Sequence, residues 1–351
     1  MRLIILSIVL SLFAALPVSA AAEGDRAAQV DRAIARGLDS LQVMQDKREG
    51  CWRDRNNRPN PAVTGLAVMA FLSAGHLPGE GRYGAVVEKG IRWVLRKQQA
   101  NGLLATDGHQ EMYQHGIATL MLAEAAGMTR AALGQDIRKA VGKAVRIILK
   151  AQRTSGQDRG GWRYRVAHVE GTDISVTGWQ VMALRAARNL GCDVPVEAID
   201  RAVAYIKRCQ DNGGGFRYMP GRGVTVACTG TSILALEICG KEHHHSDEAK
   251  RGGAFLLLKQ NLPREGQDWF FYSIYYGSQA AFQLGGNYEK IFRPRLHEVL
   301  LHMQKGGFWD GKSRDAQQGG RAYCTAMAIL ALTVEYRFLP IYQRGEEPTE
   351  K

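Results

Sequence analysis

Two kinds of apolar pattern alternate along the chain. One kind is amphipathic: in residues 139–150, Lys and Arg recur on one side and Ala, Val, Ile and Leu fill the other, which predicts a helix with one face in water. The other kind is apolar almost throughout, as in residues 63–72 and 326–332, and such a helix must be buried on most of its circumference. The alternation predicts pairs of helices, an outer helix followed by an inner one.

A repeated turn separates the two helices of each pair. A glutamine ends each amphipathic segment, and a turn rich in Gly, often with an aromatic residue, follows it. The glutamines are Gln45, Gln98 or Gln99, Gln152, Gln210, Gln260 and Gln304. A period of roughly 45 to 60 residues is typical of repeat architectures, so we expect six copies of the helix pair.

The two end units are as apolar as the middle ones. Open repeat arrays normally give their terminal units a polar outer face, but the inner segments at 67–72 and 326–332 lack one. We therefore expect unit six to pack on unit one. The predicted fold is all-α, an α/α toroid of six helix-pair repeats, in which the inner helices begin around one mouth.

The start of the chain has the order of a signal peptide: a positive residue, an apolar run at 3–16 and small residues before a cut. The expected domains are a signal peptide at 1–22, a single toroid domain at 23–345 and a polar tail at 346–351. The apolar run is shorter than the roughly 20 residues that span a bilayer. We therefore expect cleavage and export to the periplasm or beyond, with an uncleaved anchor as the alternative.

The chain is strongly basic, with a formal net charge of +12. Its Lys and Arg are scattered over helix faces and loops and form no basic arm, so we do not expect nucleic-acid binding. An anionic envelope surface or a protein partner suits this charge better. The six cysteines lack the spacing of a small disulfide-rich domain, so we expect burial for most of them, with one bridge left open.

Over about residues 28–340, the chain resembles the terpene cyclase and protein prenyltransferase repeat superfamily. The resemblance rests on the repeated turn, which is similar to the Gln-Trp motif of the cyclases. Gln152 followed by Gly161 and Trp162 is its cleanest copy. A glutamine at a helix end can bond the free backbone groups there. The motif therefore indicates the fold and carries no chemistry of its own.

Type II cyclases of the squalene-hopene kind carry an Asp-Val-Asp-Asp-Thr motif whose central Asp protonates the substrate alkene. The matching segment here keeps Asp173 and Thr177, but Ser175 takes the place of the acid. A serine hydroxyl is too weak an acid for this step. We expect Asp173 to cap the helix that follows. An acid whose pKa is raised by burial, or a ligand contact, is the alternative.

Protein prenyltransferases hold zinc with an Asp, a Cys and a His. Here Cys324 stands at the position of the His, and Asp268 in the preceding unit lacks the nearby Cys. This falls short of the three protein ligands of a catalytic zinc site, so we expect no metal and no cofactor. The three histidines at 243–245 are expected to form a solvated loop, with a metal site as the alternative.

Candidate site residues precede or begin the inner helices. Glu111 and His115, together with Asp173, offer acid and base groups, and a hydrogen-bonded loop is the alternative for the first two. Aromatic and hydroxyl side chains are expected to contact a ligand, with simple core packing as the alternative. They are Tyr113, Ser175, Thr177, Trp269, Tyr272, Tyr276 and Tyr323.

Two classes of function remain open. The first is a divergent relative of the cyclases and prenyltransferases, without their acid and zinc triad, that holds an apolar, isoprenoid-like ligand or a protein partner. Small residues at 64–65, 177–178 and 229–230 begin three inner helices and predict a hollow ring for such a guest. The second class is an enzyme, either a terpenoid cyclase with a rebuilt acid at Asp173 or a six-hairpin polysaccharide hydrolase or lyase.

Overall fold

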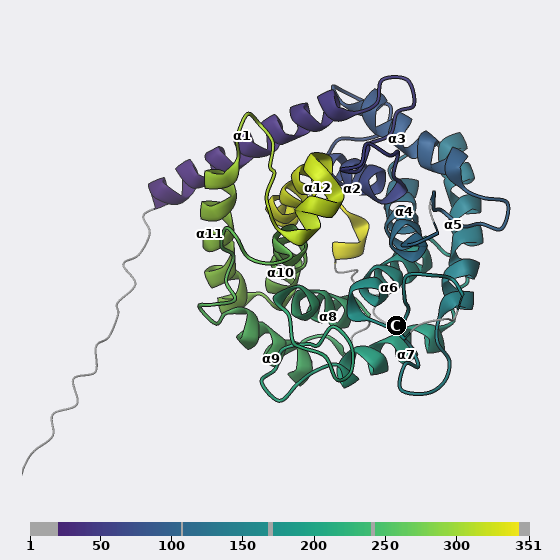
Figure 1. Cartoon of the computed structure of the whole chain (residues 1–351). Coiled ribbons are helices and arrows are strands. Elements are labelled where there is room, and N and C mark those ends of the chain that lie inside the picture. Colours follow the sequence, from purple (N-terminus) through teal and green to yellow (C-terminus); the bar gives the residue numbers. More distant parts are fainter. Residues whose placement is uncertain (1–19, 107, 168–170, 240–242, 344–351) are drawn as a thin grey trace, which may run out of the picture.

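Two concentric rings of helices make up the fold (Figure 1). The computed structural model describes residues 20–106, 108–167, 171–239 and 243–343. Within these residues the outer helices are α1 (Ala20–Met44), α3 (Gly84–Lys97), α5 (Ala131–Ala151), α7 (Val196–Arg208), α9 (Asp247–Leu256) and α11 (Gly286–Met303). The inner helices are α2 (Pro61–Ser73), α4 (Glu111–Ala126), α6 (Ile174–Asn189), α8 (Val226–Ile238), α10 (Phe270–Leu284) and α12 (Arg314–Leu332). Two short 3-10 helices follow, η2 (Val334–Tyr336) and η3 (Pro340–Tyr342).

The chain alternates between the rings, so each outer helix is followed by its inner partner. Every inner helix packs on the two beside it, and α12 packs back on α2. This confirms the predicted α/α toroid and the assignment of amphipathic helices to the outside. The predicted signal peptide and polar tail lie almost entirely outside the described residues. No helix in the described ranges is long and apolar enough to cross a membrane.

The repeat glutamines join each unit to the next outer helix. The side-chain amide of Gln152 donates to the carbonyl of Gly160 in its own turn at 3.1 Å and to that of Ala198 in α7 at 2.7 Å. Its carbonyl oxygen accepts from Arg201 at 2.8 Å. The same pair of amide bonds, to the turn and to the next outer helix, is made by Gln45, Gln98 and Gln210.

The same joint closes the ring. Gln304 donates to the carbonyl of Ala33 in α1 at 2.7 Å, across 271 positions of sequence, and accepts from Arg36 at 2.6 Å. Unit five differs, because its α9 ends at Leu256 and Gln260 is exposed beyond that end. The expectation that each of the six glutamines closes a helix is therefore wrong for unit five.

The aromatic residue of the turn is fixed from both sides. In three units its indole donates to a carbonyl of the outer helix at 2.8 Å; these residues are Trp52, Trp162 and Trp309. The backbone N–H of the aromatic residue donates to a threonine hydroxyl of the inner helix. Thr64, Thr177 and Thr229 lie near the starts of their helices, and Thr325 follows the kink at Gly320 within α12.

Small residues at the starts of the inner helices allow neighbouring helices to approach closely. A Cβ atom added at Gly178 would lie 2.1 Å from Cγ2 of Thr231 on α8. One added at Gly230 would lie 2.9 Å from the backbone nitrogen of Gly277 on α10. Adjacent inner helices occupy this space. The expectation that these small residues leave room for a guest inside the ring is therefore wrong.

The C-terminal segment lies inside the ring (Figure 1), and its contacts are with the ends of inner helices opposite the mouth. The N–H of Ile341 in η3 donates to the buried Glu124 near the end of α4 at 3.0 Å. The hydroxyl of Tyr342 bonds that of Tyr275 at 2.5 Å, and its carbonyl accepts from Gln283 at 3.3 Å. The chain thus supplies its own packing at the ends of α4 and α10.

Candidate functional site

Asp173 lies at the mouth as the N-cap of α6 and is fully buried. Its Oδ1 accepts from the N–H of Val176 at 2.9 Å and from the hydroxyl of Ser175 at 2.5 Å. Its Oδ2 accepts from the guanidinium of Arg163 at 2.7 Å. The expected helix cap is therefore present, and both carboxylate oxygens are already engaged by donors.

Opposing influences act on the pKa of the Asp173 carboxyl group. Burial raises the pKa of its carboxyl, while the hydrogen bonds from Ser175 and Val176 and the charge of Arg163 oppose this shift. An alkene would have to displace one of these donors to reach a carboxyl proton. The pKa of Asp173 is raised, so it is the occupied oxygens that argue against a proton donor here.

Arg163 links Asp173 to a group of tyrosines. It donates to the hydroxyl of Tyr218 at 2.6 Å, and its guanidinium carbon lies 4.3 Å from the ring centre of Tyr164. The hydroxyls of Tyr164 and Tyr218 are hydrogen bonded to each other. The ring of Tyr113 stacks on that of Tyr164 at 5.9 Å. Arg163 and these three tyrosines are half-buried, so part of each remains open to solvent.

The sequence carried a signal for this group that was missed. Arg163 and Tyr164 follow Trp162 in the turn of unit three, and Arg217 and Tyr218 follow the turn's Phe in unit four. An aromatic-Arg-Tyr run that recurs at the same place in two adjacent units indicates side chains that meet at the mouth.

Tyr272 connects α6 with α12 across the mouth. Its hydroxyl donates to the carbonyl of Ser175 at 2.8 Å, and its N–H donates to Oδ2 of Asp315 at 2.8 Å. The hydroxyl of Tyr323 also donates to this oxygen, at 3.3 Å. Burial raises the pKa of Asp315. We call the whole set the mouth cluster: Tyr113, Arg163, Tyr164, Asp173, Ser175, Tyr218, Tyr272, Asp315 and Tyr323.

Behind the mouth, aromatic rings pack inside the ring of helices. Trp179 of α6 stacks on Tyr275 at 5.5 Å and meets the edge of Tyr276 at 5.2 Å. Tyr276, predicted as a ligand contact, is fully buried in this packing. Tyr272 contacts the same tryptophan at 6.2 Å and is the member that reaches the mouth cluster.

The other predicted residues lie outside the mouth cluster. His115 is fully buried, and its Nδ1 accepts from the N–H of Leu104 at 3.0 Å while Nε2 lies 3.1 Å from the carbonyl of Ala144. Burial lowers its pKa to about 4. His115 thus does in unit two what threonine, such as Thr177, does elsewhere: it accepts from the turn's backbone. With both ring nitrogens engaged, it is not placed as a base for a ligand at the mouth.

Glu111 and Trp269 stand at the starts of their inner helices, outside the hydrogen bonds described for the mouth cluster. Glu111 is half-buried, and its Oε1 accepts from the N–H of Val166 at 2.6 Å. Trp269 is the N-cap of α10 in the left-handed backbone region, with a φ of 51°. Both are positioned by loops that run along the mouth.

The partial zinc triad is not assembled. Cys324 is fully buried in α12, and Asp268 is exposed with Nε of Arg314 3.5 Å away. Five of the six cysteines are buried, as expected for most of them. Within the described ranges, side chains with metal-ligand spacing meet elsewhere, where His244 and His245 fold back on Glu237. Their side chains remain 28% and 40% exposed, so this loop is partly open to solvent, as expected, while both histidines also contact a buried carboxylate.

Two hollows in the described part of the chain lie away from the mouth. One, of about 20 Å³, lies between α10, α11 and α12, and is large enough for a single water molecule. The other is an open groove of about 430 Å³ over α1, bordered by the exposed ring of Phe338. Neither is a deep chamber lined mainly by aromatic side chains.

Comparisons with known proteins support the fold. Residues 163–343 match the family described as the prenyltransferase alpha-alpha toroid domain. No curated protein matches this sequence. The type II terpene cyclase MstE from Scytonema is similar in structure, with a TM-score of 0.60 and 13% identity over 89% of this chain and 99% of the cyclase.

Two structures of carbohydrate-related proteins are also similar. An inactive variant of an α-1,6-mannanase of Salegentibacter sp. HEL1_6, in complex with α-1,6-mannotriose, has a TM-score of 0.66 and 9% identity over 87% of this chain and 98% of that chain. A sugar epimerase from a ruminal bacterium has a TM-score of 0.63 and 8% identity over 88% and 98%. At these identities the likeness shows the fold alone. The family match, however, covers more than half of the sequence, so the chain belongs to the prenyltransferase alpha-alpha toroid domain family.

Proposed function

We propose that this protein is a divergent, non-cyclase member of its family that binds a ligand at the mouth cluster. The proposal rests on one observation: both oxygens of Asp173, the remaining acid of the cyclase-like segment, are engaged by Arg163, Ser175 and the helix backbone. Because aromatic side chains fill the space behind the mouth, a ligand would be held near the entrance. Binding there needs no proton donor.

The ligand that we favour is an isoprenoid-like molecule with a polar head group. The rings of Tyr113 and Tyr164 offer apolar surface at the mouth, and Arg163 with the hydroxyl of Tyr218 offers donors for the head group. The terpene cyclase MstE has been solved with geranylgeranyl dihydroxybenzoate, a molecule that combines these two features. This compound is a suitable probe.

The test is titration calorimetry of the wild-type protein and single variants with geranylgeranyl dihydroxybenzoate. Tyr164→Ala and Arg163→Gln should each weaken binding by about tenfold, since a ring or cation–π contact contributes up to about 2 kcal/mol. Tyr288→Ala on α11 removes a half-buried tyrosine from the outer ring and should leave affinity unchanged. The proposal fails if the wild type binds no probe, or if all three variants bind equally.

A carbohydrate enzyme is the second candidate. Carboxylates begin or cap three inner helices at the same end of the ring, namely Glu111, Asp173 and Asp315, and glycosidases use a pair of carboxyl groups. Incubation with α-1,6-mannotriose tests this candidate. Turnover by the wild type that is lost in Glu111→Gln or Asp315→Asn at unchanged melting temperature would replace the binding proposal with a hydrolase.

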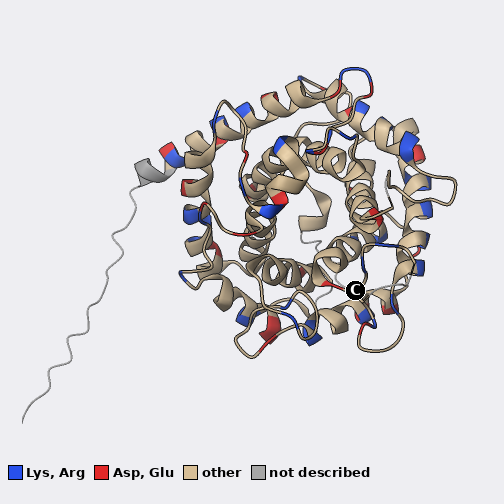
Figure 2. Cartoon of the chain, viewed as in Figure 1, with Lys and Arg blue, Asp and Glu red and all other residues tan. Residues whose placement is uncertain are grey.

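We further propose that the protein is exported and that its basic outer surface meets an anionic envelope component. The order of residues 1–22 supports export, and Lys and Arg lie around the whole outer ring (Figure 2). N-terminal sequencing of protein from its native host should start at Ala21 or Glu23. A retained Met1 would contradict cleavage. Sedimentation with anionic but not neutral lipid vesicles would support the surface contact.

A further inference from the structure

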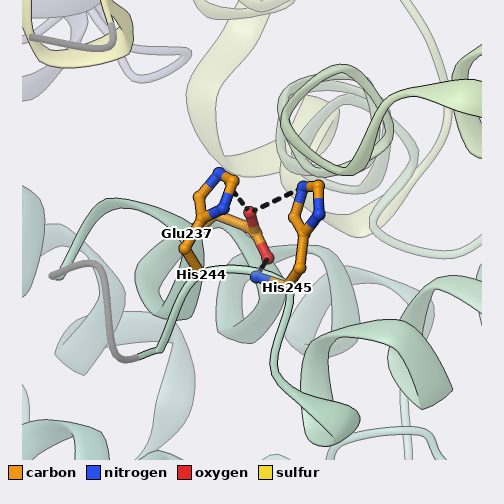
Figure 3. A group of neighbouring side chains, drawn as sticks. All are labelled: Glu237, His244 and His245. Carbon is orange, nitrogen blue, oxygen red and sulfur yellow. Dashed lines mark hydrogen bonds and ion pairs between the residues drawn. The ribbon is translucent and has the colours of Figure 1, made fainter. Parts of the chain in front are cut away.

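Three potential metal ligands meet at the end of the ring opposite the mouth (Figure 3). Glu237 lies in the last turn of α8, and its side chain is fully buried. Nε2 of His244 lies 3.1 Å from Oε2 of Glu237, and Nε2 of His245 lies 3.6 Å from the same oxygen. Both histidines come from the connector between α8 and α9.

The distances between these atoms suit a tetrahedral metal ion. Bonds of about 2.0–2.2 Å from zinc to nitrogen and oxygen place neighbouring ligand atoms about 3.3–3.5 Å apart. The two observed distances from Glu237 to His244 and His245 bracket this range. All three ligand atoms lie within 4.8 Å of one another.

The backbone holds the carboxylate and the histidines in place. The N–H of His245 donates to Oε1 of Glu237 at 2.8 Å, so Oε2 is the oxygen that faces the two rings. Hydrogen bonds of this kind orient metal ligands in known sites. His245 has a φ of 53°, a left-handed conformation that turns the connector back toward α8. Ser246 then caps α9 directly after it.

The local electrostatics favour a cation. α8 ends at Ile238 and α10 at Leu284, and the carbonyl of Gln283 lies 3.2 Å from Nε2 of His245. The C-terminal ends of helices carry partial negative charge, and Glu237 adds a buried carboxylate. The two helix ends and this carboxylate all attract a cation.

We infer that Glu237, His244 and His245 bind one divalent transition-metal ion. Imidazole nitrogens favour zinc and its neighbours over Mg²⁺ and Ca²⁺, which prefer oxygen ligands. Three protein ligands leave a fourth position for water. The two imidazole rings are stacked with centres 4.1 Å apart, so metal binding requires them to rotate until both Nε2 atoms face one point. This site is separate from the incomplete triad at Cys324 and is independent of the function proposed for the mouth.

The test uses tag-free full-length protein, treated with EDTA and dialysed, then titrated with Zn²⁺ by calorimetry. The wild type should bind one equivalent, and an excess of Mg²⁺ should not compete. Glu237→Gln and His244→Gln should each weaken binding by at least about tenfold. Cys324→Ser controls for the prenyltransferase-like position, and His302→Gln for an exposed histidine of α11; both should bind as the wild type does.

Co²⁺ titration of the wild type gives a second measurement that does not depend on any variant. Visible absorption bands of four- or five-coordinate cobalt, lost on addition of one equivalent of Zn²⁺, should appear. Circular dichroism shows whether each variant is folded. If either Glu237→Gln or His244→Gln misfolds, the remaining variant provides the test. The inference is overturned if the wild type binds neither ion stoichiometrically, or if folded Glu237→Gln and His244→Gln retain wild-type affinity.

Discussion

The glutamine joint between units three and four makes a stringent test of what stabilises the ring. Replacing Gln152 by Ala removes hydrogen bonds to the carbonyls of Gly160 and Ala198 and the acceptor of Arg201. Gln152 is only 1% exposed, so water cannot readily replace these partners. The substitution should therefore destabilise the contact between one unit's turn and the next unit's outer helix.

The expected magnitude follows from the loss of three hydrogen-bond partners. At about 0.5–1.5 kcal/mol net for each, the free energy of unfolding should fall by about 2–4 kcal/mol. With an unfolding entropy of about 2.1 cal/mol/K per residue, a chain of 351 residues has about 0.7 kcal/mol/K. The melting temperature should thus fall by about 3–6 °C.

Differential scanning calorimetry of wild type and variants measures this fall. Gln152→Met keeps the volume of the side chain while removing its polar atoms, so it should be destabilised by a similar amount. Gln260→Ala is the matched control, because this glutamine has the same place in unit five but is exposed; its effect should stay within about 0.5 kcal/mol. If Gln152→Ala and Gln260→Ala melt alike, or Gln152→Met melts like the wild type, the hydrogen-bonded joint is not what stabilises the ring.

Three further outcomes follow from other positions. Gly178→Ala should lower the free energy of unfolding by about 1–3 kcal/mol, because its Cβ would overpack against α8. Gly142→Ala on α5, where a Cβ meets open space, should raise it by about 0.4–1 kcal/mol. Urea denaturation measures both changes. Burial raises the pKa of Glu124 from 4.5 to about 8; the folded state therefore holds this proton more tightly, so stability should fall as the pH rises from about 5 to 8. Glu124→Gln should flatten that slope in melts across this range, and equal slopes would contradict the protonated carboxyl. Asp173→Asn keeps a capping side chain but loses the ion pair with Arg163, which is partly exposed. The free energy of unfolding should therefore fall by about 1–3 kcal/mol. A double-mutant cycle with Arg163→Gln that shows no coupling would contradict this.

The fold could be predicted because its signals are local and repeated. Five of the six glutamines end an outer helix, a Gly-rich turn follows within a few residues, and the two helices of a pair differ in their apolar pattern. Ring closure needed one further inference, from the apolar end units, and the bond from Gln304 to Ala33 confirms it. Where a unit departs from the pattern, as at Gln260, no neighbouring signal shows the change.

The site could be predicted only in part because the same chemical role can be filled by different residues. His115 looked catalytic as an isolated histidine near a carboxylate, but it accepts a backbone bond where other units use threonine. Asp173 was identified as a cap from its place before an apolar helix. Its partners Arg163 and Tyr218 were missed because they come from turns whose approach depends on the ring itself.

Closure through Gln304 and Ala33 has a consequence for how such a protein can change in size. An open array can gain or lose a repeat, because the new end presents the same face as the old one. A ring that loses one helix pair is left with a gap that no local shift can close, since every inner helix is already packed on two neighbours. Copy number is therefore fixed by geometry, and variation is confined to the loops that border the two openings.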